Sequence, residues 1–415
     1  MNRPAETPVP APPRPVDRKA LTLIFATVFL DLLGAGILVP VIPFLVAQFR
    51  AEATMVGLVA VAFSAAQFTA SPILGALSDR FGRRPILLVS LFGTAVGYFL
   101  FGFATALWMI FVSRLLDGVT GGNISTAQAY IADVTPPEDR AKNFGLIGAA
   151  FGLGFIIGPA LGGALSHISL QAPAFAAGIL SLITCAAAYF FLPESLPSER
   201  RRTQPVGLIE INPVRQLGLA LERPALRGLL WSVFALQFAF AELQTNFAVF
   251  TARRFGLGPA ENAWLFAFVG LSAALMQGVV IRKAVKWYSG ESLTRFGLAV
   301  AAVGFAGIAV VPAAVALLLP IALISIGNGM ASPSMTAILS ERAGGHEQGF
   351  LLGAAQSLRS LAMVLGPAWA GAVFDWIGPA STYWTASGWV LLAMFLAVRA
   401  LGSSGPARTT GAIPA

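Results

Sequence analysis

The chain has 415 residues, of which 56% are hydrophobic and 11% are charged, and its formal net charge is +8. A soluble domain carries about 25% charged residues, so this composition is that of an integral membrane protein. The basic residues lie mostly in short segments between apolar runs, which excludes a nucleic-acid-binding surface on a soluble domain. The single cysteine, Cys185, cannot form an intramolecular disulfide or a cysteine-based zinc or iron–sulfur site, and we expect no metal or cofactor.

Apolar runs of about 20 residues, each long enough to span a bilayer, recur along the chain. They predict an all-α membrane protein with twelve transmembrane helices in two halves of six, at 20–193 and 227–400. We expect the tails at 1–19 and 401–415 to be disordered, and the linker at 194–226 to hold a short interfacial helix at 213–224. The predicted helices lie near 20–48, 54–77, 85–105, 106–132, 143–166, 173–193, 227–251, 259–281, 293–312, 314–340, 349–374 and 378–400.

Lysine and arginine predict the orientation of these helices. With the amino terminus in the cytoplasm, 22 basic residues lie in inner segments, and only Arg50, Arg253 and Arg254 lie outside. Cytoplasmic loops carry this excess of positive charge, so we expect both termini in the cytoplasm.

The two halves resemble each other at a constant offset of 208 residues. The shift places Gly158-Pro159 on Gly366-Pro367, and it also superimposes four further sets of small residues. A repeat of this kind predicts two six-helix halves related by an axis along the membrane normal, with a substrate site between them near the midplane.

A charged stretch, GALSDRFGRRP, occupies residues 75–85 between the second and third predicted helices. The positive-inside rule accounts for its arginines, but not for its acid, its glycines or their spacing. The stretch matches G-x-L-x-D-R-x-G-R-[KR], the signature of the major facilitator superfamily in this loop. The chain therefore resembles that superfamily at Gly75, Leu77, Asp79, Arg80, Gly82, Arg83 and Arg84.

The resemblance implies that this loop belongs to an inner gate, which is closed when a transporter faces outward. Asp79 ends the second helix, where its carboxylate can face the positive amino terminus of the eleventh helix in the other half. The superfamily also implies a pair between Arg83 and Asp133, an acid that ends the fourth helix. We expect Asp79 to affect transport rate more than substrate affinity.

A glycine-rich stretch, GLGFIIGPALGG at 152–163, lies in the fifth predicted helix. No strand precedes it, so it is not a dinucleotide-binding loop. Its glycines recur every four residues and leave one helical face open to a neighbouring helix, while the proline permits a bend, so packing alone accounts for the pattern. It also resembles the fifth-helix motif of exporters in the superfamily, which implies export. The matching residues are Gly154, Gly158, Pro159, Gly162 and Gly163.

The fourth predicted helix contains RLLDGVTGG, in which Arg114 and Gly118 match an R-x-x-x-G motif whose arginine the superfamily links to proton coupling. Asp117 stands where glutamine is common, three residues from Arg114 on the same helical face, so we expect it to neutralise that arginine. The first helix, with Asp31, and residues 114–163 resemble the tetracycline-efflux proteins. Those proteins carry further acids in helices three and nine that this chain lacks, which argues against tetracycline as the substrate.

Five ionisable residues lie near the middle of predicted helices, and each costs about 2.5–3.5 kcal/mol on insertion scales. They are Asp31, Arg114, Asp117, Glu242 and Arg359. Three acids against two arginines leave one acid unpaired, and burial disfavours its charged form, so it can bind and release protons. Asp31 is the first candidate for this surplus acid and Glu242 is the second.

Glu242 and Arg359 each have two interpretations that helical phase does not separate. Glu242 is either hydrogen-bonded to neighbouring helices or a counter-charge for a cationic substrate in a central cavity. Arg359 either pairs with Glu242 or attracts an anionic substrate.

Together, these features and the resemblance predict a monomeric multi-pass transporter of a bacterial-type inner membrane. It is not an enzyme, and it exports small amphipathic organic compounds, including drugs, in exchange for protons. No nucleotide-binding motif is present, so ion gradients must supply the energy. Two alternatives stay open: a proton-coupled importer, against which the fifth-helix motif argues, and a lipid or glycolipid flippase on the same fold.

Overall fold

A computed structural model describes residues 18–49, 52–121, 123–136, 140–201, 217–218, 220–342 and 348–402. Within these ranges the chain is helical and contains no β-strand. Nine helices in the described ranges are long and apolar enough to cross a membrane, so the prediction of an all-α membrane protein is confirmed. They are Arg18–Leu38, Ala53–Phe81, Arg83–Gly102, Ala172–Phe191, Leu226–Phe255, Gly290–Val310, Ala314–Arg342, Gly353–Trp376 and Ser381–Leu401.

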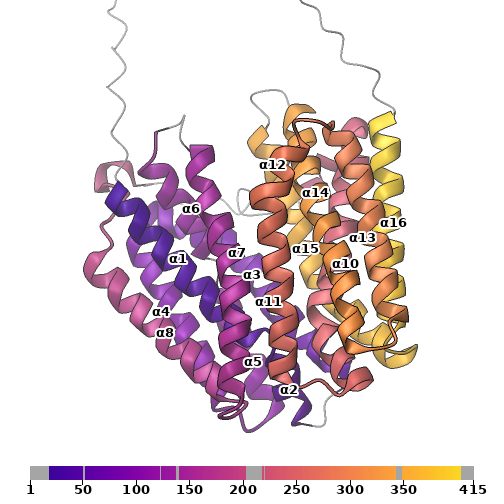
Figure 1. The fold of residues 1–415 in the computed structure, drawn as a ribbon. Helices are drawn as coiled ribbons and strands as arrows, with labels where there is room; N and C mark the ends of the chain where they lie inside the picture. The colour runs from indigo at the N-terminus through magenta and orange to yellow at the C-terminus, as the bar shows by residue number, and fades with distance from the viewer. Residues whose placement is uncertain are drawn as a thin grey trace, which may run out of the picture.

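The helices form two bundles that lie side by side (Figure 1). The first bundle contains α1 (Arg18–Leu38), α2 (Ile42–Ala47), α3 (Ala53–Phe81), α4 (Arg83–Gly102), α5 (Leu107–Thr120), α6 (Asn123–Asp133), α7 (Arg140–Ser166) and α8 (Ala172–Phe191). The second contains α10 (Pro224–Phe255), α11 (Pro259–Leu275), α12 (Ile281–Ala284), α13 (Gly290–Val310), α14 (Leu318–Arg342), α15 (Gln348–Trp376) and α16 (Ser381–Gly402). The interfacial helix expected at 213–224 falls mostly outside the described residues.

Three predicted helices are interrupted in the structure. The first run breaks after Leu38, because prolines at 40 and 43 cannot donate backbone hydrogen bonds, and α2 restarts with proline in its first turn. The fourth run breaks at Gly121, where glycine lowers helix stability and α5 gives way to α6. The eighth run passes through a π-helical turn at Met276–Val280 between α11 and α12.

The first helix of each bundle packs against its last two long helices. In the first bundle α1 packs against both α7 and α8, and in the second α10 packs against both α15 and α16. Around α10 the second bundle buries one continuous apolar cluster, with Phe247, Phe250 and Phe305 among its largest side chains. Burial of these side chains stabilises the packing of the second bundle.

The two bundles meet along two helix pairs, α3 with α15 and α7 with α11. Gly57 of α3 packs on the backbone of Pro367 in α15, and Gly163 of α7 packs on Ala260 and Ala263 in α11. These contacts lie toward the end of the molecule that holds α2, here called the closed end. At the opposite end, where α1 begins and α16 ends, the bundles diverge (Figure 1); this is called the termini end.

Candidate functional site

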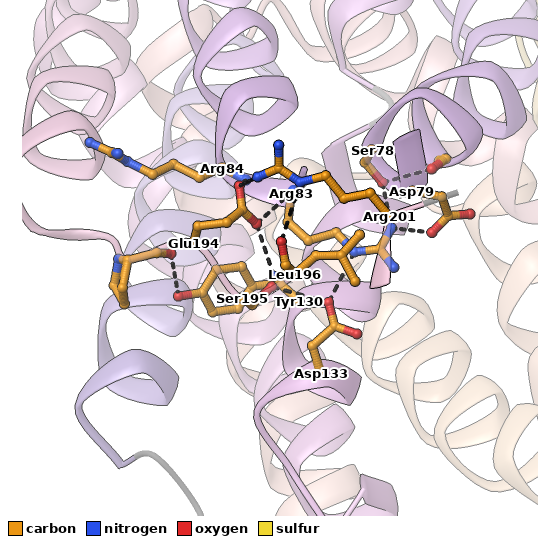
Figure 2. A network of polar contacts seen from close by, with 12 residues as sticks. Ser78, Asp79, Arg83, Arg84, Tyr130, Asp133, Glu194, Ser195, Leu196 and Arg201 are labelled. Atoms are coloured by element: carbon orange, nitrogen blue, oxygen red, sulfur yellow. Dashed lines mark hydrogen bonds and ion pairs between the residues drawn. The ribbon is translucent and has the colours of Figure 1, made fainter. Parts of the chain in front are cut away.

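Arg83 is the centre of a polar cluster at the termini end (Figure 2). It begins α4 directly after Gly82, whose φ of +107° favours glycine. Its Nη1 lies 2.5 Å from Asp79 Oδ1 and donates to Ser78 Oγ at 2.7 Å, and its Nε donates to Asp133 Oδ2 at 3.0 Å. The expected pair of Arg83 with Asp133 is therefore present, and it joins the start of α4 to the ends of α3 and α6.

Glu194, which the sequence analysis did not single out, caps the start of α4. Its carboxylate accepts the backbone N–H groups of Arg83 at 2.9 Å and Arg84 at 3.3 Å, where Gly82 offers no capping side chain (Figure 2). Arg201 lies 3.8 Å from the same carboxylate. A carboxylate at a helix amino terminus satisfies unpaired donors and complements the helix dipole. In the sequence, the one feature that could have pointed to Glu194 is its position directly after the sixth predicted helix.

The other residues of the signature lie around this cluster. Arg84 donates to the Tyr189 carbonyl, and its guanidinium lies 5.5 Å from the Tyr189 ring centroid. Arg80 is exposed, and Gly75 packs loosely near Ser125.

Asp79 contacts its own bundle rather than α15. Its carboxylate pairs with Arg83, and 44% of its side chain is exposed. The bundles diverge at this end, and residues 343–347, which precede α15, lie outside the described residues. The contact expected between Asp79 and the amino terminus of the eleventh helix is thus not made by the described residues in this conformation.

The second bundle holds an ion pair at the equivalent helix ends, with the positions of the acid and the base exchanged. Glu291, at the start of α13, lies 3.7 Å from Arg342 at the end of α14, and also 3.7 Å from Arg295. Arg83 and Asp133 occupy the corresponding ends of α4 and α6. In each bundle, therefore, a charge pair ties the start of one helix to the end of the next.

Inside the first bundle, Arg114 and Asp117 form a buried ion pair. Arg114 Nη1 lies 3.1 Å from Asp117 Oδ2, and the side chains are 6% and 5% exposed. The guanidinium lies 4.5 Å from the Phe101 ring centroid and 5.6 Å from that of Tyr98, and its Nε and Nη2 have no hydrogen-bond partner among the described residues. The expected neutralisation of Arg114 by Asp117 is present.

Tyr98 brings Asp31 into the same group. Asp31 is half-buried on α1 and interacts electrostatically with Tyr98, which also interacts with Arg114 and Asp117. Three of the five predicted mid-helix charges therefore gather around one buried tyrosine.

Glu242 lies in the second bundle, fully buried between α10 and α16. Its Oε2 accepts a 2.8 Å hydrogen bond from Thr385 Oγ1, and its Oε1 has no partner among the described residues. At 3.6 residues per turn, Glu242 lies about 160° around the helix from the exposed Gln244. Glu242 is therefore hydrogen-bonded to a neighbouring helix, and it faces away from the side of α10 that Gln244 occupies.

Arg359 does not pair with Glu242. Its Nη2 donates to Thr336 Oγ1 of α14 at 2.8 Å. Two contacts set the register of α10 against α15: Asn246 donates to the Ala370 carbonyl, and Gly366 packs on Ala241. Glu242 therefore lies level with the residue after Gly366. Arg359 lies about 12 Å from that level along the axis of α15. Of the two interpretations of Arg359, pairing with Glu242 is not found in this structure, because the two residues lie about two turns apart.

A groove of about 260 Å³ lies between α15 and α16, next to Glu242. It is lined by Trp369, Thr385, Gly388, Trp389 and Leu392. The Trp389 ring centroid lies 4.6 Å from that of Phe238 on α10. Thr385 thus connects an aromatic groove on the bundle surface with the buried carboxyl.

The glycine stretch of α7 packs against the backbone of α1. A Cβ added at Gly158 would lie 2.7 Å from Gly36 Cα, and one at Gly154 would lie 3.2 Å from Leu32 O. Gly162 packs on the Ile37 carbonyl, and Pro159 is buried. The expected close approach of a neighbouring helix is present, and that helix carries Asp31.

A family model described as the Major Facilitator Superfamily matches residues 24–367. The chain belongs to the Major Facilitator Superfamily. Among curated proteins, the chain is 34% identical to the tetracycline resistance protein, class C, of Escherichia coli, over 90% of this chain and 93% of that one. It is 29% identical to multidrug resistance protein 2 of Bacillus subtilis (strain 168), over 85% of this chain and 88% of that one.

Two solved structures share the fold of this chain. The human organic anion transporter MFSD10 (TETRAN) superimposes with a TM-score of 0.70 at 27% identity, over 92% of this chain and all of that one. A bacterial homolog of the human lysosomal transporter Spinster, in an inward-facing and unoccupied conformation, gives 0.74 at 16% identity, over 95% of this chain and all of that one. This Major Facilitator chain is therefore a multi-pass membrane transporter and not an enzyme.

Proposed function

We propose that this chain exports small amphipathic organic compounds, including drugs, across a bacterial-type inner membrane in exchange for protons. The main support for drug export is the match to tetracycline and multidrug resistance proteins over most of the chain. The glycine motif of α7, which implies export in this superfamily, agrees with it. No cofactor is required, because the proton gradient supplies the energy.

The finer architecture is twelve spans in two halves of six, with both termini in the cytoplasm and a monomer as the functional unit. The excess of lysine and arginine near the termini end supports this orientation. Two internal correspondences support the repeat. Gly158 packs on α1 and Gly366 packs on α10, the first helix of each half. The pairs Arg83–Asp133 and Glu291–Arg342 occupy equivalent helix ends.

In this orientation the structure is an inward-facing state. The halves touch at the closed end, which faces outward, and diverge at the cytoplasmic end. The loop that holds Asp79 and Arg83 is then an inner gate in its open position. When the transporter turns outward, Asp79 approaches the amino terminus of α15, where the helix dipole favours a carboxylate.

We assign proton coupling to the mid-membrane acids Asp31 and Glu242. Asp117 pairs with Arg114 at 3.1 Å, and we assign that acid to the ion pair. Asp31 is the first candidate because it lies on α1, beside the glycine face of α7, and Glu242 is the second. Intramembrane acids at such positions commonly serve as proton relays.

The experiment is to follow the internal pH of energised inverted vesicles that hold the protein, while cationic, neutral and anionic drugs are added. We expect drug-triggered proton release from the wild type and none from Asp31→Asn. Release that persists in Asp31→Asn but vanishes in Glu242→Gln moves the carrier to Glu242. No response of the wild type to any compound contradicts antiport and favours a lipid flippase.

A further inference from the structure

The closed end contains one polar contact between the halves whose geometry is that of a helix cap. Asp375 lies in the last turn of α15 and its side chain is 8% exposed. Its Oδ2 accepts the backbone N–H of Thr54 at 2.7 Å and the Thr54 hydroxyl at 2.6 Å, and its Oδ1 accepts the N–H of Ala53 at 3.3 Å. Ala53 and Thr54 are the first two residues of α3, in the other half.

The cap comes from the other half because α3 does not cap itself. Its N-cap residue, Glu52, makes no capping hydrogen bond with its side chain. The first turn of a helix leaves backbone N–H groups unpaired, and a carboxylate there also complements the helix dipole. Asp375 supplies both interactions across the boundary between the halves.

The position of Asp375 on its own helix is electrostatically unfavourable. A carboxylate in the last turn faces the negative end of the dipole of α15. Arg253, at the end of α10, lies 3.9 Å from Asp375 Oδ1 and offsets part of this cost. Both residues belong to the second half, so this pair survives any separation of the halves, whereas the cap on α3 does not.

Close backbone contact makes the cap depend on the position of the two helices. Gly371, one turn before Asp375, packs on Thr54 Cα and Ala53 O, and Gly57 packs on the Pro367 carbonyl. Residue numbers rise along α3 as they fall along α15, so the two helices are antiparallel and each amino terminus faces the other's carboxyl end. A small separation at the closed end therefore breaks all three hydrogen bonds of Asp375 with α3.

The same antiparallel pair carries a second acid at its other end. Asp79 occupies the last turn of α3, at the termini end, where α15 begins. Here it is 44% exposed and binds Arg83 within its own half. Asp375 is therefore engaged across the halves, whereas the contact that the structure describes for Asp79 lies within its own half.

We infer that Asp375 is the latch of the outer gate: it caps α3 in the inward-facing state and releases α3 when the transporter opens outward. In the inward-facing state Asp375 of α15 caps α3, and in the outward-facing state Asp79 of α3 caps α15. The two caps lie at opposite ends of the α3–α15 pair and form in alternation. Asp375 acts as a positioning residue that sets the ratio of the two states. This inference takes the membrane orientation from the proposed function, but its test needs no substrate and no proton gradient.

The experiment measures distances between spin labels in full-length protein, in which Cys185→Ser removes the one native cysteine. Labels at Ile168 and Val315, exposed residues of different halves at the closed end, report the outer gate. Labels at Ser198 and Lys283 report the termini end. Labels at Trp108 and Ile168, both in the first half, report whether that half is folded.

We expect Asp375→Ala to lower the ratio of closed to open outer gate about tenfold, because it removes a charged cap. Thr54→Val keeps the backbone N–H and loses only the hydroxyl, so it lowers the ratio about threefold. Should Asp375→Ala fail to fold, Asp375→Asn and Thr54→Val carry the test. In each variant the Ile168–Val315 distance lengthens, the Ser198–Lys283 distance shortens, and the Trp108–Ile168 distance stays as in the wild type.

Glu261→Ala is the matched control. Glu261 is also an acid at the closed end, and it accepts a hydrogen bond from Gly258 N at 2.9 Å at the start of its own helix, α11, within one half. We expect this variant to leave all three distances unchanged. The inference is overturned if the folded Asp375 variants keep the wild-type distribution at Ile168–Val315, or if Glu261→Ala shifts it equally. Drug-triggered proton release that fails in the wild type overturns the proposed function and leaves this distance test intact.

Discussion

Thr385 donates a 2.8 Å hydrogen bond to Glu242, and this bond ties α16 to α10 at a carboxyl group that is fully buried and whose second oxygen has no partner among the described residues. Burial of a carboxyl group costs free energy when its oxygens are not all hydrogen-bonded. If Glu242 served only to hold α10 and α16 together, an apolar side chain would do so at lower cost. We therefore expect Glu242 to have a functional role.

Glu242→Leu tests that distinction. We expect it to raise the unfolding free energy by about 1–3 kcal/mol, because an apolar side chain of similar size removes a poorly paired buried carboxyl. We also expect slower drug efflux. Thermal unfolding in detergent and efflux from whole cells are the two measurements. Lower stability together with normal efflux would show that Glu242 serves only to hold the helices together.

Asp117→Asn should strongly destabilise the protein. It removes the carboxylate that lies 3.1 Å from the buried Arg114, a guanidinium two of whose nitrogens already lack partners among the described residues. Breaking a buried ion pair on one side costs about 3–5 kcal/mol. The double variant Arg114→Met with Asp117→Asn should regain most of this stability but not transport. Denaturant unfolding of both single variants and the double variant checks the prediction, and additive losses would contradict it.

Glu194→Gln should weaken the start of α4. The carboxylate accepts two backbone N–H groups there, and loss of a cap costs about 0.5–2 kcal/mol. Glu194→Ala should cost more, because it removes both acceptors. Glu199→Gln is the matched control, since that acid is exposed and accepts a hydrogen bond from its neighbour Ser198. Hydrogen exchange at the first turn of α4 is the measurement, and equal exchange in the Glu194 and Glu199 variants would count against the cap.

Gly158→Ala should impair both folding yield and efflux. Its Cβ would lie 2.7 Å from the backbone of Gly36, so α1 and α7 would have to separate and Asp31 would move with α1. Gly152→Ala, in the same helix, meets nothing within 4 Å and should behave as the wild type. Expression level and drug resistance of the two strains give the comparison. Equal behaviour of the two variants would mean that the close contact with α1 is dispensable.

The sequence was sufficient for features that depend on local pattern and composition. Apolar runs of bilayer length predicted the helices, because a membrane requires every backbone group to be paired within its own segment. The resemblance of the charged stretch to the superfamily signature implied the pair of Arg83 with Asp133, and the four-residue spacing of Gly154, Gly158 and Gly162 predicted a close helix contact. The spacing of three residues between Arg114 and Asp117 also predicted that the two side chains lie together on one helical face.

Only the tertiary structure decided which groups of different helices meet. Glu194 and Asp375 are single acids in sequence, and each becomes a cap only because a distant helix begins beside it. Arg359 and Glu242 look like a charge pair in sequence, yet the register of α10 against α15 places them about two turns apart. The helical period determines which face of a helix a residue occupies. The relative height and rotation of two packed helices depend instead on contacts between side chains that are distant in the chain. A local sequence pattern holds no information about those contacts.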